Sequence, residues 1–325
     1  MKYNNIGASG LRAGFLGLGT LTWGMDTDLD DARRSLVALR EAGGNFVDVS
    51  PLYSDGGAVS VLSELLKSSV GRNELIISAH LTPPFDPRAS DAWQGAFMGR
   101  AAILTSLDSL LAALGTDTID FAVIDYTYEH APVDETMAAL ADAVHQGKIR
   151  YVCINGAPLW FTAMMAQHAI SRSYPPITGL AQPYSLLERG NDSELLAARE
   201  HFGIGMIAYS PLAGGVLTGK YNNTIPPTSR AATEHLANLV SPYLYEAPLQ
   251  ITGAVARAAD GLARTPADVA LAWLMGEPNV SVAVCGPRTG SQAEQLFSAQ
   301  LDALPTQVAQ ALDDISRPQL KYPEE

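Results

Sequence analysis

Eight short apolar segments recur along the chain, and each is followed by a longer amphipathic stretch. Such alternation is typical of strand–helix units, because a helix between two strands gives the long connection that parallel pairing requires. The predicted strands are Phe15–Leu18, Phe46–Val47, Leu75–Ala79, Phe121–Ile124, Tyr151–Ile154, Ile177–Ala181, Met206–Tyr209 and Val280–Val284. The predicted helices span residues 31–42, 57–69, 99–114, 134–146, 158–171, 193–202, 250–275 with a break at Thr265-Pro266, and 291–301.

Eight strand–helix units in 325 residues favour an α/β protein with a closed (β/α)8 barrel, the TIM barrel, over an open doubly wound sheet. The fragment Gly17-Leu-Gly19 is too short to be the Gly-x-Gly-x-x-Gly turn of a dinucleotide-binding sheet. We therefore predict one domain over residues 1–325. An N-terminal β-hairpin over roughly residues 2–12 is expected to cap the bottom of the barrel, with extra C-terminal helices packed outside.

The overall charge limits the classes of partner. With 21 basic and 34 acidic residues the net charge is −13, and no run rich in Lys or Arg occurs, which argues against nucleic acid or an anionic membrane as partner. The start of the chain lacks the pattern of a signal peptide, and no apolar run is long enough to span a membrane. We expect a small-molecule substrate and a cytoplasmic location. Cys153 and Cys285 lie in apolar strand-like runs and are predicted to be buried thiols.

Polar residues follow the predicted strands where the barrel would place an active site. In a TIM barrel, the loops at the C-terminal ends of the strands build that site. The residues at these positions are Asp48, Tyr53, His80, Asp125, Asn155, Gln182, Tyr184 and the run Ser210–Gly215. The long connections over residues 81–98 and 216–249 are expected on the same face.

Several of these segments resemble the aldo-keto reductases, NAD(P)H-dependent carbonyl reductases built on a (β/α)8 barrel. The resemblance covers essentially the whole chain. It is carried by Ile6–Leu11, Leu16–Gly24, Asp48 with Tyr53, Leu114–Asp120, Gln146–Arg150, Tyr184–Arg189 and the specific run Ile207-Ala-Tyr-Ser-Pro-Leu-Ala-Gly-Gly-Val-Leu-Thr-Gly-Lys-Tyr221. The resemblance implies the same fold and a carbonyl reductase activity.

The resemblance also implies four catalytic groups: a tyrosine acid, a lysine that lowers its pKa, an aspartate paired with that lysine, and a histidine that orients the carbonyl. Tyr53 and Asp48 match, whereas His80 stands at the lysine position and Asp125 at the histidine position. If Asp48 and Asp125 hold His80 in its charged form, His80 can take over from the lysine.

Other interpretations of these residues stay open. His80 can be a structural histidine, and Asp125 a hydrogen-bonded carboxylate at a strand end. His130 can swing inward as a substitute for the missing histidine. Two carboxylates and one imidazole are also legitimate ligands of a divalent metal, although the ligand spacing does not demand one. We predict no metal.

NADP is the cofactor that the resemblance implies, unless none is used. The predicted cofactor-binding residues are Asn155, Gln182, Tyr184, Ser210, Leu212, Gly214, Arg288 and Gln292. The chain departs from the family here: Asn155-Gly156 replaces a Ser-Asn pair, and Leu296 stands where an asparagine amide is expected. The phosphate-contacting segment from Ser210 is kept, as is Arg288 near a helix N-terminus, which is a natural anion site.

Aromatic side chains are the candidates for substrate contacts. Trp23 and Tyr126 are predicted to bind substrate, and Tyr53, Phe85, Trp93 and Tyr128 are further candidates. We predict NADP(H)-dependent reduction of a carbonyl, or oxidation of a secondary alcohol, on a bulky small molecule with Tyr53 as general acid. Two alternatives stay open. One is a redox-neutral acid–base enzyme (dehydratase, cyclase, epimerase or lyase), and the other is a non-catalytic ligand-binding protein. The sequence leaves the oligomeric state undecided.

Overall fold

The computed structural model describes residues 1–82, 98–126, 131–190, 192 and 200–318. In these residues, eight parallel strands close into a barrel in which chain order and spatial order agree. The strands are β3 (Leu16–Gly19), β4 (Phe46–Val49), β5 (Ile76–His80), β6 (Ile119–Asp125), β7 (Ile149–Asn155), β8 (Ile177–Pro183), β9 (Gly205–Tyr209) and β10 (Val280–Cys285), and β10 pairs with both β9 and β3. The predicted (β/α)8 barrel is confirmed.

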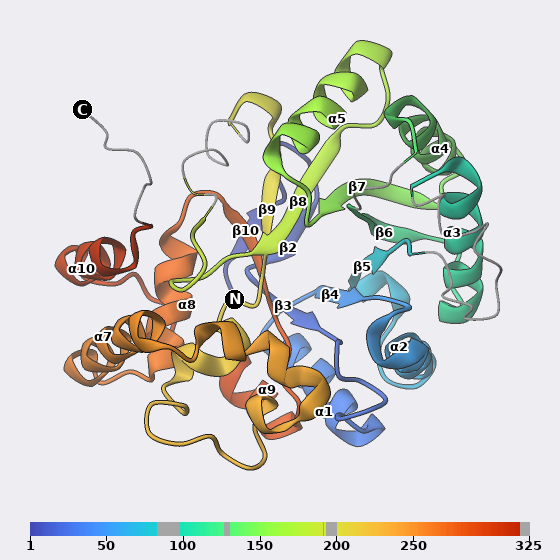
Figure 1. Cartoon of the computed structure of the whole chain (residues 1–325). Helices are drawn as coiled ribbons and strands as arrows, with labels where there is room; N and C mark the ends of the chain where they lie inside the picture. Colours follow the sequence, from blue (N-terminus) through green and yellow to red (C-terminus); the bar gives the residue numbers. More distant parts are fainter. Residues whose placement is uncertain (83–97, 127–130, 191, 193–199, 319–325) are drawn as a thin grey trace, which may run out of the picture.

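Helices lie outside the barrel; α1 to α8 connect successive strands, and α9 and α10 follow the last strand (Figure 1). They are α1 (Leu29–Glu41), α2 (Gly57–Ser68), α3 (Arg100–Leu114), α4 (Val133–His145), α5 (Leu159–Arg172), α7 (Glu246–Leu262), α8 (Pro266–Gly276), α9 (Gly290–Phe297) and α10 (Thr306–Ser316). The break predicted at Thr265-Pro266 separates α7 from α8. There the Thr265 hydroxyl accepts the Asp268 N–H, and Pro266 occupies the first turn, which is a strong helix start.

Two helix predictions have different outcomes. The helix predicted over 291–301 is shorter, because α9 ends at Phe297, after which Ser298 caps it. The helix predicted over 193–202 lies largely outside the described residues. In the described parts of the chain, no helix has both the length and the apolar composition that a membrane span needs.

An N-terminal hairpin closes the end of the barrel opposite to the candidate site. Strand β1 (Tyr3–Asn5) pairs antiparallel with β2 (Arg12–Gly14), so the hairpin extends two residues beyond the predicted 2–12. The Asn4 side-chain amide donates to the Ser281 carbonyl at 3.2 Å, and Ala8 N–H donates to the Gly203 carbonyl at 2.7 Å. Both acceptors precede or begin barrel strands, which fixes the hairpin at the N-terminal ends.

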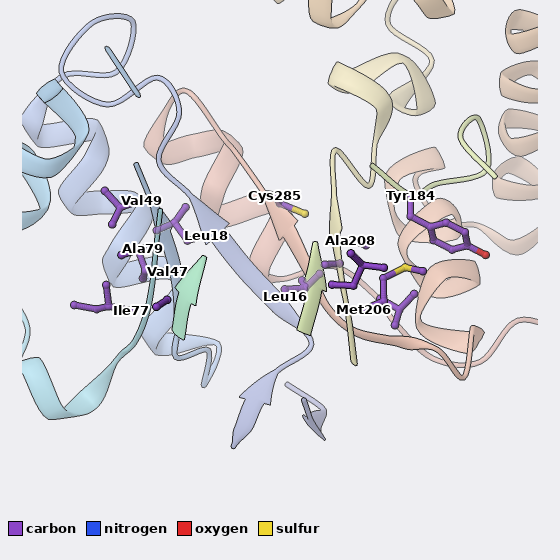
Figure 2. Packing of buried hydrophobic residues seen from close by; sticks show 14 of the residues in the cluster. Leu16, Leu18, Val47, Val49, Ile77, Ala79, Tyr184, Met206, Ala208 and Cys285 are labelled. Atoms are coloured by element: carbon purple, nitrogen blue, oxygen red, sulfur yellow. The ribbon is translucent and has the colours of Figure 1, made fainter. Parts of the chain in front are cut away.

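Side chains alternate between the barrel interior and the helix-facing layer, as the two-residue period of a strand requires. Phe46 on β4 faces inward and meets Phe121 on β6 edge to face, with ring centroids 6.3 Å apart. Val47 and Val49 face the surrounding helices (Figure 2). Gly179 is needed beside Phe121, because a Cβ there would lie 2.4 Å from the ring. This alternation places Asp48, two residues after Phe46, inside the barrel.

Both cysteines are buried free thiols, as predicted. Cys153 belongs to the interior cluster with Phe46 and Phe121, and Cys285 lies in the helix-facing layer. Burial raises the pKa of both thiols, that of Cys285 to about 12. Neither thiol is therefore an activated nucleophile in this structure.

Candidate active site

A cluster of polar side chains occupies the C-terminal ends of adjacent barrel strands. Strand register explains why they meet: Asp48 is paired with Ser78, and His80 is paired with Val123, two residues before Asp125 on the same face of β6. Asp125 in turn is paired with Asn155. The ends of β4, β5, β6 and β7 thus bring together the four side chains Asp48, His80, Asp125 and Asn155.

Asp48 is the acceptor at the centre of the cluster. Its Oδ1 accepts hydrogen bonds from the hydroxyls of Ser78 at 2.8 Å and Tyr209 at 3.0 Å, and its Oδ2 accepts one from Tyr53 at 3.2 Å. The side chain is almost completely buried. An ionised carboxylate only accepts hydrogen bonds, so three hydroxyl donors suit the charged form of Asp48.

His80 lies between the two carboxylates. Its Nδ1 lies 2.8 Å from Oδ1 of Asp125, and its Nε2 lies 3.3 Å from the Tyr209 hydroxyl and 3.5 Å from Oδ1 of Asp48. Burial disfavours the charged imidazole, but Asp48 and Asp125 outweigh burial and raise the pKa of His80 to about 10. At neutral pH His80 is therefore a buried cation whose two N–H groups both have partners.

Asp125 is held in its ionised form. Burial opposes its charge, but the His80 cation and the hydrogen bond from the Asn155 amide at 2.7 Å lower the pKa of Asp125. His80 and Asp125 therefore form a charged pair rather than two neutral groups. The side chain of Asp125 is 28% exposed, compared with 4% for His80.

The pKa of Tyr53 differs from the expectation. His80 was expected to lower it, but burial and the charges of Asp48 and Asp125 raise it well above its ordinary value. The Tyr53 and His80 ring centroids lie 5.7 Å apart, and the imidazole directs its N–H groups to Asp125 and Tyr209 instead. Tyr53 is thus a phenol that stays protonated over the whole physiological range.

Tyr209 is a member of the cluster that the sequence analysis missed. It ends β9, its hydroxyl joins His80 to Asp48, and its ring stacks near the His80 ring at a centroid distance of 6.2 Å. Burial and Asp48 raise its pKa well above the ordinary value. One feature of the sequence could have identified Tyr209: it ends a strand, immediately before Ser210. His80 and Asp125 also stand at strand ends.

A cavity of about 780 Å³ runs from this cluster across the ends of β9 and β10. Such a volume suits a large organic ligand. Its catalytic end is lined by Asp48, Tyr53 and Tyr209. The rest of the lining includes Ser210, Leu212, Gly214, Gly215, Lys220, Arg230, Gln292 and Leu296. The cavity therefore joins the acid–base cluster to most of the predicted phosphate-binding segment.

Backbone conformation in the loop after β9 depends on glycine. Gly214 and Gly215 have φ values of 64° and 95°, in the left-handed region that glycine adopts at low cost. A Cβ on Gly214 would lie 2.9 Å from the Leu239 carbonyl oxygen. Glycine at position 214 thus lets the loop pack closely against Leu239.

Three cations gather at the far part of the cavity. Lys220 and Arg230 line it, and Arg288 lies close enough to lower the pKa of both, although burial is the larger cause. Among the described residues, no carboxylate forms an ion pair with any of the three; the guanidinium groups donate to backbone carbonyls of Gly286 and Thr228. Uncompensated positive charge beside a glycine loop is suited to a phosphate group. Lys220 and Arg230 were not singled out from the sequence.

Three more of the residues predicted to bind the cofactor, Gln292, Gln182 and Tyr184, lie in different surroundings. Gln292 lines the cavity and accepts the Arg288 N–H at 3.0 Å through its Oε1. The Gln182 amide donates to the Ala157 carbonyl at 2.7 Å. Tyr184 stacks on Trp273 of α8 with centroids 6.1 Å apart, and Figure 2 shows it directed away from the barrel. It does not line the cavity described here.

The two residues predicted to bind substrate, Tyr126 and Trp23, differ in how far they are buried. Tyr126 is half-buried after β6 and meets Phe161 edge to face at 4.8 Å. Trp23 is completely buried, and its indole N–H has no hydrogen-bond partner among the residues that the structure describes. As placed, Trp23 offers no surface to a substrate. The candidates Phe85, Trp93, Tyr128 and His130 lie outside the described residues, as does most of the 81–98 connection.

Comparison with known proteins identifies the family. The profile described as "Aldo/keto reductase family" matches residues 15–317. The chain belongs to the aldo/keto reductase family. This agrees with the resemblance inferred from the motifs and with the barrel.

Relatives of this aldo/keto reductase carry several names. L-glyceraldehyde 3-phosphate reductase of Escherichia coli K12 is 33% identical over 308 residues, which cover 91% of this chain and 86% of that protein. An uncharacterised oxidoreductase of Bacillus subtilis is 29% identical over 323 residues, covering 97% and 96%. A probable voltage-gated potassium channel subunit beta of Oryza sativa is 29% identical over 332 residues, covering 97% and 95%. The names of these three relatives therefore do not agree on a single function.

Proposed function

We propose that the protein is an NADP(H)-dependent oxidoreductase that reduces a carbonyl, or oxidises a secondary alcohol, on a bulky small molecule. The observation that carries this proposal is the continuous cavity, which joins a glycine loop, Lys220 and Arg230 to Tyr53, with Arg288 close to both cations. The names of the relatives from Escherichia coli and Bacillus subtilis agree with an oxidoreductase.

The residues along the cavity fit a phosphorylated dinucleotide. Lys220, Arg230 and Arg288, which have no carboxylate partner in the described part of the chain, would hold its phosphates, and the extra positive charge favours NADP over NAD. Ser210 and the backbone near Gly214 would contact the pyrophosphate, and Gln292 would lie at the adenine end. When bound at the catalytic end, the reduced cofactor supplies a hydride.

Tyr53 is the proton donor in this proposal. Its raised pKa keeps the hydroxyl protonated, and the hydrogen bond to Asp48 fixes its position at the end of the cavity. When a substrate carbonyl is bound, the Tyr53 O–H turns from Asp48 to the carbonyl oxygen, and Tyr53 gives up its proton as negative charge develops there. The buried His80 cation, in place of the family's lysine, offsets part of the negative charge of Asp48 and Asp125 around the resulting phenolate.

A second candidate function is supported by the His80–Asp125 pair. The imidazole lies 2.8 Å from the carboxylate, and two tyrosines are nearby. These groups could also transfer protons in a reaction that involves no hydride transfer. A redox-neutral enzyme such as a dehydratase, cyclase, epimerase or lyase would use these groups alone.

Measurements of turnover with NADPH distinguish the reductase from the redox-neutral enzyme. NADPH oxidation should be followed by absorbance with a panel of aromatic and aliphatic aldehydes and ketones, and the alcohol products should be measured. We expect stoichiometric conversion of NADPH and carbonyl to NADP⁺ and alcohol. Cofactor-independent change of a substrate, with no NADPH consumption for any carbonyl, would instead support the redox-neutral candidate.

A further inference from the structure

Among the described residues, one carboxylate oxygen of Asp125 has no hydrogen-bond partner. Its Oδ1 receives both hydrogen bonds, from His80 Nδ1 at 2.8 Å and from the Asn155 amide at 2.7 Å. None of the described residues donates to Oδ2, and 28% of the side chain is exposed. His80 and Asp48 are by comparison almost entirely buried. Asp125 is therefore positioned by two neighbours through one oxygen and leaves the other oxygen for a ligand.

The cluster carries an uncompensated negative charge. Asp48 and Asp125 are both acidic, and His80 is the one cation that contacts either of them among the described residues. Lys220 and Arg230 line the cavity, and neither forms an ion pair with Asp48 or Asp125. In a site of low dielectric, one net negative charge attracts a cation and repels a group that only accepts hydrogen bonds. Oδ2 of Asp125 would thus repel a carbonyl oxygen or a carboxylate of a ligand.

Tyr53 and Asp125 flank the same imidazole ring. The Tyr53 ring lies 5.7 Å from the His80 ring, and Asp125 is bonded to His80 Nδ1. The charge of Asp125 also reaches Tyr53, since it contributes to the raised pKa of the phenol. Tyr53 and Asp125 therefore both lie next to His80 at the same end of the barrel.

We infer that the substrate is an amino-carbonyl compound, whose ammonium group, on the carbon next to the carbonyl, binds Oδ2 of Asp125 while the carbonyl oxygen binds Tyr53. This inference rests on the carbonyl reduction proposed above. It names the substrate class from the open carboxylate oxygen and the net charge of the cluster.

The reduction step balances with these groups. The carbonyl carbon gains the hydride that NADPH supplies, and the electron pair of the C=O π bond passes to the oxygen. That oxygen takes the proton of the Tyr53 hydroxyl, and solvent returns a proton to the phenolate. The ammonium group keeps its protons and is unchanged, so the product is an amino alcohol and the second product is NADP⁺.

Three phenyl ketones of the form C6H5–CO–CH2–X test the inference, with X as ammonium, hydroxyl or methyl. They share one skeleton and differ in charge and hydrogen-bond donors. We expect kcat/KM for the ammonium compound to exceed that for the methyl compound by about tenfold to a hundredfold, the range for one hydrogen bond between charged groups. The hydroxyl compound should fall between them.

Asp125→Asn should reduce this preference to within about threefold, because the amide keeps the shape but loses the charge. Asp108→Asn is the matched control: it also removes one carboxylate, but Asp108 is exposed on α3 and pairs with Lys148. The control should keep the full preference. Circular dichroism should show that both variants fold.

Binding gives a readout that does not need turnover. Calorimetry with 2-phenylethylammonium and 2-phenylethanol, with and without NADPH, should show tighter binding of the ammonium compound to the wild type and equal binding to Asp125→Asn. Equal kcat/KM values for the three ketones, with equal binding of the two probes, would overturn the inference while leaving the reductase activity intact. Failure to reduce any carbonyl would overturn the proposed function, and the binding pair would still decide whether Asp125 holds a cation.

Discussion

His80 and Asp125 form an ion pair in which Nδ1 of the buried imidazole lies 2.8 Å from Oδ1 of the partly exposed carboxylate. They stand on adjacent strands, and the register of β5 against β6 places both at the same end of the barrel. The sequence analysis placed this pair at the positions where resemblance to the family implies a lysine and a histidine. Experiments that change the charge or the protonation of this pair therefore test its role in the protein.

Stability should depend on pH through His80. Its pKa is about 10 in the folded protein and near 6.5 in an unfolded chain, so the folded state binds the proton more tightly. The stabilisation is fully present below pH 6.5 and is lost as pH rises through about 10. The loss should be on the order of 2–4 kcal/mol. Urea unfolding of the wild type and His80→Gln at pH 6, 8 and 10 measures it, because titrating groups that do not interact with His80 cancel in the difference. A difference that does not change with pH would contradict the assignment.

Tyr53→Phe should separate chemistry from binding. Without the hydroxyl the developing alkoxide has no proton donor, so kcat for carbonyl reduction should fall by about 10²–10⁴-fold. The cofactor affinity should change little, because the ring and the shape of the cavity are kept. Steady-state kinetics and an NADPH titration of the variant test both halves. Full activity in Tyr53→Phe would place the proton donor elsewhere.

Gly214→Ala should damage the loop after β9. The left-handed φ of 64° and a Cβ only 2.9 Å from the Leu239 carbonyl predict a loss of roughly 1–3 kcal/mol and weaker cofactor binding. Gly261→Ala is the control, because Gly261 lies in α7 with nothing within 4 Å of the added Cβ. That change should stabilise by about 0.5–1 kcal/mol. Thermal unfolding distinguishes them, and equal melting temperatures for the two variants would refute the steric argument.

Restoring the family's residues should separate the two candidate functions. In a reductase, His80→Lys with Asp125→His places a permanent cation near Tyr53, and kcat for a neutral ketone should rise; each unit by which the phenol pKa falls corresponds to about 1.4 kcal/mol. In a redox-neutral enzyme the same double change removes the imidazole–carboxylate pair and should abolish the native reaction without creating a reductase. The kinetics of the double variant with neutral ketones and NADPH decide between these outcomes.

The fold and part of the site were predictable, for different physical reasons. Strand and helix periodicity is local, so the barrel could be recognised, and strand ends such as those at Asp48 and Asp125 located the acid–base residues. The position of Tyr184 was not predictable, because its stacking on Trp273 depends on how α8 packs. Arg230 reaches the cavity from a long irregular connection, through its bond to the Gly286 carbonyl. No periodic pattern marks such a contact between distant residues.

The direction of the Tyr53 pKa shift also could not be obtained from the sequence. The residues near Tyr53 suggested that a cation would lower it, but the structure gives the greatest weight to burial, followed by Asp48 and Asp125. Which partner an imidazole faces depends on atomic positions. His80 faces Asp125 and Tyr209, and residue types alone do not determine that choice.

Binding of NADPH is the most direct test of the central claim that the cavity holds a phosphorylated dinucleotide. Quenching of intrinsic fluorescence should saturate in the wild type, and Arg230→Met should weaken binding at least about tenfold through loss of a charged hydrogen bond. Arg317→Met, a change at an exposed arginine just after α10, should leave the affinity unchanged. Saturable binding that only Arg230→Met weakens is the predicted result. Absence of saturable binding up to millimolar NADPH would contradict the account.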